Sequence, residues 1–372
     1  MSTVRPPLPV IPPEIVAACD YARQARFHLD DNAWAYLAGG AADERGLAKN
    51  RDAFADFQIW PRVLADVRGG HTRCTLFGQT LAHPLLVAPV AYQRLFHEQG
   101  ELATALGAGV MAAPMVVSSL ATTRLEVLAR QASGALWFQL YWQGDRARSL
   151  ELVRRAEAAG YQALVLTVDA PLAGIRNREQ RAAFHLPAGM AAVNLQPGRG
   201  PAALPDGGSP VFDGVMQTAP GWDDVAWLRG QTHLPLVIKG VLHPQDARQA
   251  VACGADGLIV SNHGGRVLDV APAPLHVLPE IRAALGGSVP LLLDGGVTRG
   301  SDVLIALALG ANAVLLGRPV MHALAVAGAL GVAHLLRLLR EELEITMALA
   351  GCRTLSDITP SCLRAAGGGG DL

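Results

Sequence analysis

Eight short apolar runs recur along the chain, and segments of helical character lie between them. Each run is almost entirely apolar, which is typical of a strand that is covered on both faces. Alternating strands and helices indicate a parallel sheet, and eight such strands that close on themselves form a TIM (β/α)8 barrel. We therefore expect an α/β barrel. The runs are residues 85–89, 114–118, 136–140, 163–168, 235–239, 257–261, 290–294 and 313–316, with helices expected at 150–159, 244–252 and 301–309.

The alternative arrangement is an open doubly wound sheet. The chain lacks the Gly-x-Gly-x-x-Gly turn that a dinucleotide-binding fold carries after its first strand, which favours the barrel. Residues 14–364 are expected to form a single domain, with an extra amino-terminal segment at 14–80 that packs over the barrel ends. Residues 170–221, rich in Gly, Pro and Ala, form a long loop after the fourth strand, and such loops are typical of lids.

Composition narrows the class of protein further. A formal net charge of -1 argues against a nucleic-acid binder, because such proteins usually carry a basic excess. Five scattered cysteines without a Cys-x-x-Cys pair indicate reduced thiols in a cytoplasmic protein, and no metal site. No uninterrupted apolar run reaches the length of a bilayer span, so we expect no membrane partner. The proline-rich residues 1–13 are expected to be flexible and the glycine-rich tail 365–372 disordered.

The run 257–266 carries the most informative strand end. Its apolar residues stop at Ser261-Asn262-His263-Gly264-Gly265-Arg266. In a barrel of this type the carboxyl ends of the strands carry the chemistry. A histidine there can move a proton near neutral pH, and an arginine can hold a carboxylate through two parallel hydrogen bonds. The two glycines would let the backbone approach a flat ligand.

Most of the other predicted strands also end in polar or charged groups. Gln139 and Tyr141 follow the third strand, and Lys239 the fifth, and none of these is an ordinary turn residue. A buried lysine in particular needs a partner. Ser118, Gln139, Thr167 and Lys239 could together contact a polar ring system. Asp169 could instead cap a turn, Tyr36 could be a core aromatic, and Arg176 could be a solvated charge of the lid.

The last two strand ends indicate a phosphate site. TIM barrels often bind phosphate after strands seven and eight, through glycine backbone and a helix amino terminus. The segments Asp294-Gly295-Gly296-Val297-Thr298-Arg299-Gly300 and Gly317-Arg318 fit this arrangement. Arg299 and Arg318 are the expected counter-charges. A phosphate-bearing ligand is therefore expected across the barrel mouth.

Taken together, these motifs resemble the FMN-dependent 2-hydroxy acid oxidases and dehydrogenases. The most specific is Ser261 to Arg266, supported by Leu166-Thr167-Val168-Asp169, Asp294-Gly295-Gly296 and Gly317-Arg318-Pro319-Val320. The resemblance extends from Tyr36-Leu37-Ala38-Gly39-Gly40-Ala41 to Ala350-Gly351-Cys352-Arg353. The run Pro89-Val90-Ala91-Tyr92-Gln93-Arg94-Leu95-Phe96-His97 is similar to that of hydroxymandelate oxidases in particular.

This resemblance implies a role for each site residue. His263 would be the proton-accepting base and Asp169 its supporting carboxylate. Arg266 and Arg176 would clamp the substrate carboxylate, and Tyr36 and Tyr141 would donate hydrogen bonds to the substrate. Lys239 would place its charge beside the flavin. The implied FMN contacts are Pro89, Val90, Ala91, Ser118, Gln139, Tyr141, Thr167, Lys239, Ser261, Asp294, Gly295, Gly296, Thr298, Arg299, Gly317 and Arg318.

Two positions depart from the family pattern. Leu120 stands where glycolate oxidases carry a tryptophan, so the substrate pocket is expected to be wider, suited to medium-sized or aromatic 2-hydroxy acids. Thr298 stands where the family usually has an arginine. Arg299, the next residue, could take over the missing phosphate contact.

The electron acceptor is expected to be O2. The sequence shows no amino-terminal haem domain, and the lid is a poor membrane anchor. The expected reaction is the oxidation of an S-configured 2-hydroxy acid to the 2-oxo acid, with formation of H2O2, by a homotetramer. The alternatives are a soluble dehydrogenase that uses a quinone or another acceptor, a different FMN barrel enzyme such as an isomerase, and a non-catalytic flavin-binding scaffold.

Overall fold

Eight parallel strands close into a barrel in the computed structural model, which describes residues 4–196 and 204–366. All eight strands predicted from the apolar runs are confirmed. Around the barrel they follow the order β10-β11-β4-β5-β6-β7-β8-β9, which is the order of the chain. The strands are β4 (Leu85–Val87), β5 (Met115–Ser118), β6 (Leu136–Tyr141), β7 (Leu164–Thr167), β8 (Leu236–Val241), β9 (Gly257–Val260), β10 (Leu291–Asp294) and β11 (Ala313–Leu316).

Both faces of the barrel strands are buried, which explains their uninterrupted apolar sequence. Leu86, Val116 and Trp137 belong to a cluster that fills the interior of the barrel. Their neighbours Leu85 and Val117 belong to the larger cluster between the strands and the surrounding helices. Successive strand residues thus alternate between the two cores.

A hairpin closes the amino end of the barrel. It consists of β2 (Cys74–Leu76) and β3 (Gln79–Leu81), which pair antiparallel. Phe77, at its turn, packs beside Gly257 at the start of β9 and lies 5.5 Å from the Trp137 ring, measured between ring centroids. Leu76 and Leu81 join the interior cluster. The amino end is therefore apolar and filled, and a ligand can enter only from the carboxyl end.

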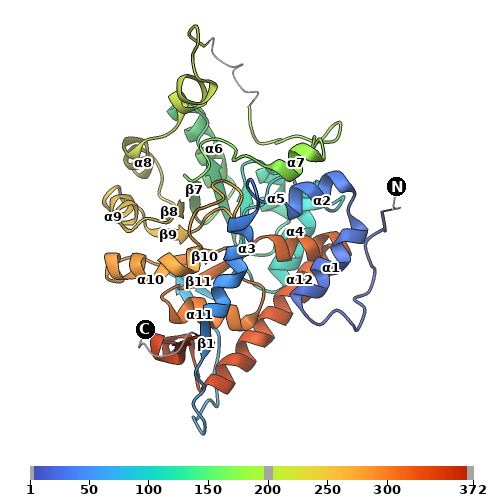
Figure 1. Ribbon diagram of the computed structural model, residues 1–372, viewed down its shortest axis with the longest axis vertical. Helices are drawn as coiled ribbons and strands as arrows, with labels where there is room; N and C mark the ends of the chain where they lie inside the picture. Colours follow the sequence, from blue (N-terminus) through green and yellow to red (C-terminus); the bar gives the residue numbers. More distant parts are fainter. Residues whose placement is uncertain (1–3, 197–203, 367–372) are drawn as a thin grey trace.

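Three helices of the amino-terminal segment lie toward the carboxyl end of the barrel (Figure 1): α1 (Ala18–His28), α2 (Asp31–Ala38) and α3 (Arg45–Asp52). The reciprocal amide hydrogen bonds between Asn50 of α3 and Asn262, at 2.8 and 2.7 Å, fix α3 to the loop after β9. This segment thus packs over both ends of the barrel, as the sequence predicts.

The remaining helices surround the barrel. The predicted helices at 150–159, 244–252 and 301–309 correspond to α6 (Arg146–Ala158), α9 (Pro244–Ala252) and α11 (Gly300–Ala308). The longest helix, α12 (Arg318–Ala350), bends at Ala327 and Gly328. By length and composition it could cross a membrane. However, two thirds of its most apolar 18-residue stretch is buried inside the protein, as in the core helix of a globular domain. The surrounding helices are α4 (Gly100–Val110), α5 (Leu125–Gln131), α6 (Arg146–Ala158), α8 (Trp222–Arg229), α9 (Pro244–Ala252), α10 (Pro274–Leu285), α11 (Gly300–Ala308) and α12 (Arg318–Ala350).

The predicted lid contains more structure than its composition suggests. Its first part forms α7 (Asn177–Arg181), which lies beside α2 (Figure 1), and its second part forms the short helical segments Pro210–Gly214 and Val215–Thr218. Residues 197–203 lie outside the described residues. Arg178 donates to both carboxylate oxygens of Glu44, which anchors α7 to the start of α3.

The two chain ends are more ordered than predicted wherever the structure describes them. Residues 4–13 were expected to be flexible, but Arg5 N donates to Phe27 O at 2.9 Å and Leu8 N to Val326 O at 2.7 Å. The tail expected from residue 365 begins inside a strand, because β12 (Leu363–Ala365) pairs antiparallel with β1 (Phe57–Ile59). Residues 1–3 and 367–372 lie outside the described residues.

Candidate active site

A cavity of about 1020 Å³ opens at the carboxyl ends of the strands. Most of the residues that the sequence analysis selected lie on its wall. Asp169, Gln139, Ser261 and Arg299 are absent from the described lining. The selected residues that line the cavity are Tyr36, Pro89, Val90, Ala91, Ser118, Leu120, Tyr141, Thr167, Arg176, Lys239, His263, Arg266, Asp294, Gly295, Gly296, Thr298, Gly317 and Arg318.

His263 is held between a carboxylate and a phenol. Its Nδ1 lies 2.9 Å from Asp169 Oδ1, and its Nε2 lies 3.2 Å from the Tyr141 hydroxyl. The residue sits directly after β9 with a positive φ of 58°, a conformation that non-glycine residues rarely adopt. The Ser261 hydroxyl accepts a hydrogen bond from the His263 backbone N–H at 3.0 Å, which supports this turn. The imidazole is therefore fixed at both nitrogens.

The electrostatic surroundings keep His263 neutral and Asp169 ionised. Burial and the Lys239 charge lower the pKa of His263, and Asp169 opposes them only in part. Burial disfavours the charged form of Asp169, but Lys239 and His263 outweigh it and lower the pKa of this carboxyl. An ionised Asp169 accepts a hydrogen bond from Nδ1–H, which leaves the lone pair on Nε2. Burial also raises the pKa of the Tyr141 phenol, which therefore remains protonated.

Lys239 is a buried cation with two named partners. Its Nζ donates to the Ser261 hydroxyl at 2.8 Å and lies 3.1 Å from Asp294 Oδ2. Burial disfavours its charge, but the carboxylates of Asp294 and Asp169 hold the pKa of Lys239 above its usual value. The Ser261 hydroxyl thus lies behind the cavity wall and accepts hydrogen bonds from both the Lys239 ammonium and the His263 backbone N–H.

Two arginines line the substrate side of the cavity, and a glutamate that the sequence analysis did not select lies between them. Arg266 Nη2 lies 2.8 Å from Glu179 Oε1, and Arg176 Nη1 lies 3.5 Å from the same oxygen. Arg176 Nε is buried and has no hydrogen-bond partner among the described residues. No local motif marks Glu179, because it reaches the site from the lid helix α7.

Arg266 and Arg318 also hold the carboxyl end of α2. Arg266 Nη1 donates to the carbonyls of Tyr36 and Gly39, both at 2.7 Å. Arg318 donates to the carbonyls of Leu37, Gly39 and Gly264 at 2.7 to 3.0 Å. Cations stabilise the exposed carbonyls of a helix carboxyl end. This contact positions the Tyr36 ring, which lies 4.9 Å from the Arg266 guanidinium.

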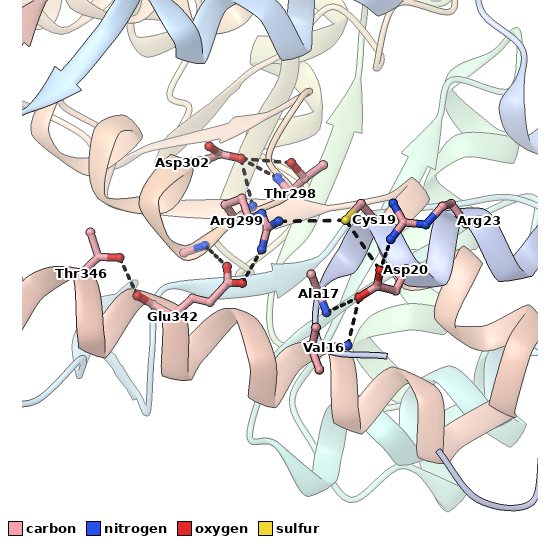
Figure 2. Close-up of polar contacts among 11 residues, drawn as sticks. Val16, Ala17, Cys19, Asp20, Arg23, Thr298, Arg299, Asp302, Glu342 and Thr346 are labelled. Atoms are coloured by element: carbon pink, nitrogen blue, oxygen red, sulfur yellow. Dashed lines mark hydrogen bonds and ion pairs between the residues drawn. The ribbon is translucent and has the colours of Figure 1, made fainter. Parts of the chain in front are cut away.

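Arg299, which the sequence predicts as a phosphate contact, does not lie on the described cavity wall. The Arg299 guanidinium forms an ion pair with Glu342 of α12 at 2.9 Å and points toward Cys19 of α1 (Figure 2). Thr298, one residue earlier, lines the cavity, and its hydroxyl donates to Asp302 Oδ2 at 3.2 Å. Neighbouring residues in this turn face opposite sides, and this orientation of Arg299 does not favour the predicted phosphate contact.

Two glycines of the strand-end motifs, Gly265 and Gly296, leave room for a helix of the protein itself. A Cβ at Gly296 would lie 1.9 Å from the Asn50 carbonyl oxygen, and one at Gly265 would lie 2.6 Å from the Leu47 backbone nitrogen. Both contacts are with α3. These glycines, which have positive φ angles of 90° and 71°, are therefore required for the packing of α3 over the barrel.

A side-chain network underlies one wall of the cavity. Gln139 Nε2 donates to the Thr167 hydroxyl at 3.0 Å, and Gln139 Oε1 accepts from the Ser118 hydroxyl at 3.0 Å. Gln139 thus orients Ser118 and Thr167 from behind.

Two further residues from distant helices line the cavity. Arg51 lies on α3, and His322 lies one turn after Arg318 on α12. Burial and the charge of Arg318 lower the pKa of His322 to about 3, so this imidazole is neutral. Only the fold brings these residues to the site, and no sequence motif marks them.

The donor set fits FMN. Asp294 Oδ1 is buried without a hydrogen-bond partner among the described residues, so it remains available to accept from a hydroxyl of a bound ligand. Lys239 supplies a cation a short distance away, and Gly317, Arg318 and Arg51 line the cavity as candidate phosphate contacts. Within residues 4–196 and 204–366, no cluster of three or more His, Cys, Asp or Glu side chains could hold a metal ion.

Known proteins resemble the chain over nearly its whole length. The family model described as FMN-dependent dehydrogenase matches residues 25–365. An L-lactate oxidase from Alicycliphilus denitrificans is 53% identical, covering 95% of this chain and 98% of the relative. A 4-hydroxymandelate oxidase from Amycolatopsis orientalis is 47% identical, covering 91% and 96%. A crystal structure of mandelate oxidase with benzoyl-formic acid is 44% identical with a TM-score of 0.86, covering 94% and 98%.

Proposed function

The chain belongs to the family of FMN-dependent dehydrogenases, and on this basis we propose that it oxidises a 2-hydroxy acid to the corresponding 2-oxo acid, with O2 as the electron acceptor and H2O2 as the second product. The observation that carries this proposal is the hydrogen-bonded arrangement Asp169–His263–Tyr141, in which His263 and Tyr141 line the same cavity as two arginines. It combines a base for the substrate with a site for its carboxylate.

His263 is the proposed catalytic base. Its Nε2 is unprotonated and lies at the cavity wall, within hydrogen-bond distance of the Tyr141 hydroxyl. A substrate hydroxyl or C2–H placed there can transfer its proton to Nε2. The ionised Asp169 stabilises the imidazolium that results, because an opposite charge within hydrogen-bond distance favours the charged form. Tyr141 stays protonated and donates to the substrate oxygen.

Arg176 and Arg266 are proposed to bind the substrate carboxylate. The unpartnered Nε of Arg176 provides a donor for one carboxylate oxygen. Arg266 is fixed by the α2 carbonyls, so its remaining N–H groups have a defined direction. Charge-assisted hydrogen bonds of this kind orient a substrate as well as bind it. Tyr36, whose ring stacks on Phe184 of the lid at 4.9 Å, completes the wall.

FMN, when bound, accepts the two electrons released at C2 of the substrate. We propose that Lys239 places its charge beside the flavin ring and that Ser118 and Thr167 donate hydrogen bonds to it. Asp294 would hold the ribityl chain, and Gly317 and Arg318 the phosphate. Gln139 and Ser261 act on this site through the residues that they bond.

The proposed substrates are medium-sized or aromatic S-2-hydroxy acids. Leu120 lines the cavity together with the apolar groups Tyr92, Phe184 and Leu186. An apolar wall at this point suits an uncharged substituent on C2. The names of the relatives, which include both a lactate and a hydroxymandelate oxidase, agree with a site that accepts substituents of different size.

Anaerobic reduction followed by exposure to air tests this function. The purified FMN-loaded protein should lose its yellow colour on mixing with a 2-hydroxy acid without O2. Air should restore the colour within seconds and release one H2O2 for each flavin. Bleaching without rapid reoxidation would instead identify a dehydrogenase with another acceptor, and no bleaching with any 2-hydroxy acid would favour a flavin-binding scaffold.

We also propose a cytoplasmic homotetramer. All five cysteines are free thiols in the structure, which agrees with a reducing compartment. Light scattering on the purified protein would give the oligomeric state directly, and a monomer in solution would contradict the tetramer.

A further inference from the structure

Glu179 lies at the centre of the substrate-binding charges. Its Oε1 is 2.8 Å from Arg266 Nη2 and 3.5 Å from Arg176 Nη1. Only 12% of its side chain is exposed, and the side chains of Arg266 and Arg176 are 14% and 20% exposed. Among the described contacts, no other carboxylate is within ion-pair distance of either arginine. Glu179 therefore neutralises one of the two positive charges at this end of the cavity.

The hydrogen-bonding capacity that remains is suited to one carboxylate. Arg266 Nη1 already donates to the carbonyls of Tyr36 and Gly39, and Nη2 donates to Glu179. Arg176 has an unpartnered, buried Nε among the described residues. The local charge of the two arginines and Glu179 is +1, which a single carboxylate neutralises.

The other cations on the described cavity wall are not arranged for a second carboxylate. Lys239 is paired with Asp294, and Arg318 is bonded to three backbone carbonyls. Arg51 lies exposed on α3, next to Asn50, and it is Asn50 that contacts the loop after β10. Leu120, Tyr92 and Phe184 also line the cavity, and burying an unpaired charge against such groups is costly.

We propose that Glu179 determines the charge specificity of the site: it sets the net charge to +1 and thereby restricts the enzyme to 2-hydroxy monocarboxylates. This inference rests on the proposed 2-hydroxy acid oxidation. Glu179 acts as a positioning and specificity-determining residue, because it contacts the substrate arginines. It also connects the lid to the site, so the same contact holds α7 over the cavity.

The test compares two substrates of the same shape and different charge. Malate carries a second carboxylate at neutral pH, whereas its 4-amide carries a neutral group of the same size in that place. Anaerobic stopped-flow reduction of the FMN-loaded enzyme gives Kd and the limiting rate for each substrate separately. The wild type should bind the amide at least tenfold more tightly than malate.

The decisive variant is Glu179→Gln, which retains an oxygen acceptor and removes the charge. It should raise the affinity for malate relative to the amide by on the order of tenfold, because one negative charge is removed from the substrate end of the cavity. Glu179→Asp retains the charge and should keep the wild-type ratio. Glu44→Gln is the matched control. Glu44 pairs with Arg178, the neighbour of Glu179 on α7, and does not contact Arg266.

Three results would overturn the inference. One is a wild-type enzyme that binds malate as tightly as the amide, a result that needs no variant. The second is an unchanged ratio in Glu179→Gln, and the third is an equal shift in Glu179→Asp. If the wild type reduced its flavin with neither these nor any other 2-hydroxy acids, the proposed function itself would fail, which is a distinguishable outcome.

Discussion

The two ends of the cavity use their charged residues differently. At the substrate end, His263, Tyr141 and the two arginines lie together at the cavity wall, and Asp169 bonds to His263 from behind the wall. At the phosphate end, Arg299 turns away to Glu342, and Arg318 donates to three backbone carbonyls. The difference shows that a charged residue in a ligand-binding motif can have its main contacts with the protein. The substrate end is built for chemistry, and the phosphate end relies more on backbone and packing.

The largest expected effect is that of His263→Ala at the substrate end. The variant loses the proton acceptor, so the rate of anaerobic flavin reduction should fall about 10³-fold or more, as expected for a general base that also positions the substrate. FMN should remain bound, because the phosphate end is unchanged. His334→Gln is the control, because this histidine does not line the cavity and its Nδ1 contacts the Tyr21 hydroxyl instead. A reduction rate of His263→Ala within tenfold of the wild type would exclude His263 as the base.

Asp169→Asn should have a smaller effect with a defined pH signature. The flavin reduction rate should fall about 10²-fold, because the imidazolium loses its counter-charge. The negative charge of Asp169 raises the pKa of His263, so its removal should lower that pKa further. The rate requires neutral His263 and falls when pH drops below this pKa. The acid limb of the pH–rate profile should therefore move to lower pH; a move to higher pH would contradict the assigned electrostatics.

Leu120→Trp tests the apolar wall of the substrate end. A larger side chain should reduce kcat/KM for mandelate by about tenfold or more, because overfilling a packed pocket is costly. The value for glycolate should change little, and Leu120→Met serves as a control of similar volume. Equal losses for both substrates would show that Leu120 does not limit the size of the substituent.

Strand-end residues at the substrate end could be predicted from the sequence because the barrel fixes where they meet. Once the apolar runs identify eight parallel strands, the residues after each strand must lie at one end of the barrel. His263, Lys239 and Tyr141 follow from this rule alone. Glu179, Arg51 and His322 do not, because they belong to a lid or to helices whose docking depends on the tertiary structure.

The predictions at the phosphate end depend on side-chain directions that the strand pattern does not determine. The family pattern has an arginine at the position of Thr298, and Arg299 was expected to replace it, but Arg299 faces the other side of the turn. The two residues are adjacent in sequence, yet the direction of a side chain in a turn depends on backbone angles that no composition rule predicts. The glycine motifs predict a close approach to a ligand, and in the structure Gly265 and Gly296 also admit α3.

Thr298→Arg should strengthen the phosphate end. The new guanidinium would lie at the cavity wall and could form charge-assisted hydrogen bonds with the phosphate, so Kd for FMN should fall about tenfold. Kd for riboflavin, which has no phosphate, should not change. Thr298→Gln, a long but uncharged side chain, is the control. If the new side chain paired with Asp302 instead, FMN and riboflavin affinities would respond equally.

The smallest expected effect is that of Arg299→Ala. The ion pair with Glu342 is partly exposed, with 47% and 26% of the two side chains accessible, so its loss should lower the free energy of unfolding by only about 0.5 kcal/mol. A double-mutant cycle with Glu342→Ala, measured by denaturant unfolding, separates this pair from the hydrogen bond that Glu342 accepts from Gly300 N. FMN affinity should not change. A tenfold loss of FMN affinity with unchanged riboflavin affinity would show that Arg299 leaves Glu342 to bind the phosphate, and the two ends of the cavity would then be more alike than the structure indicates.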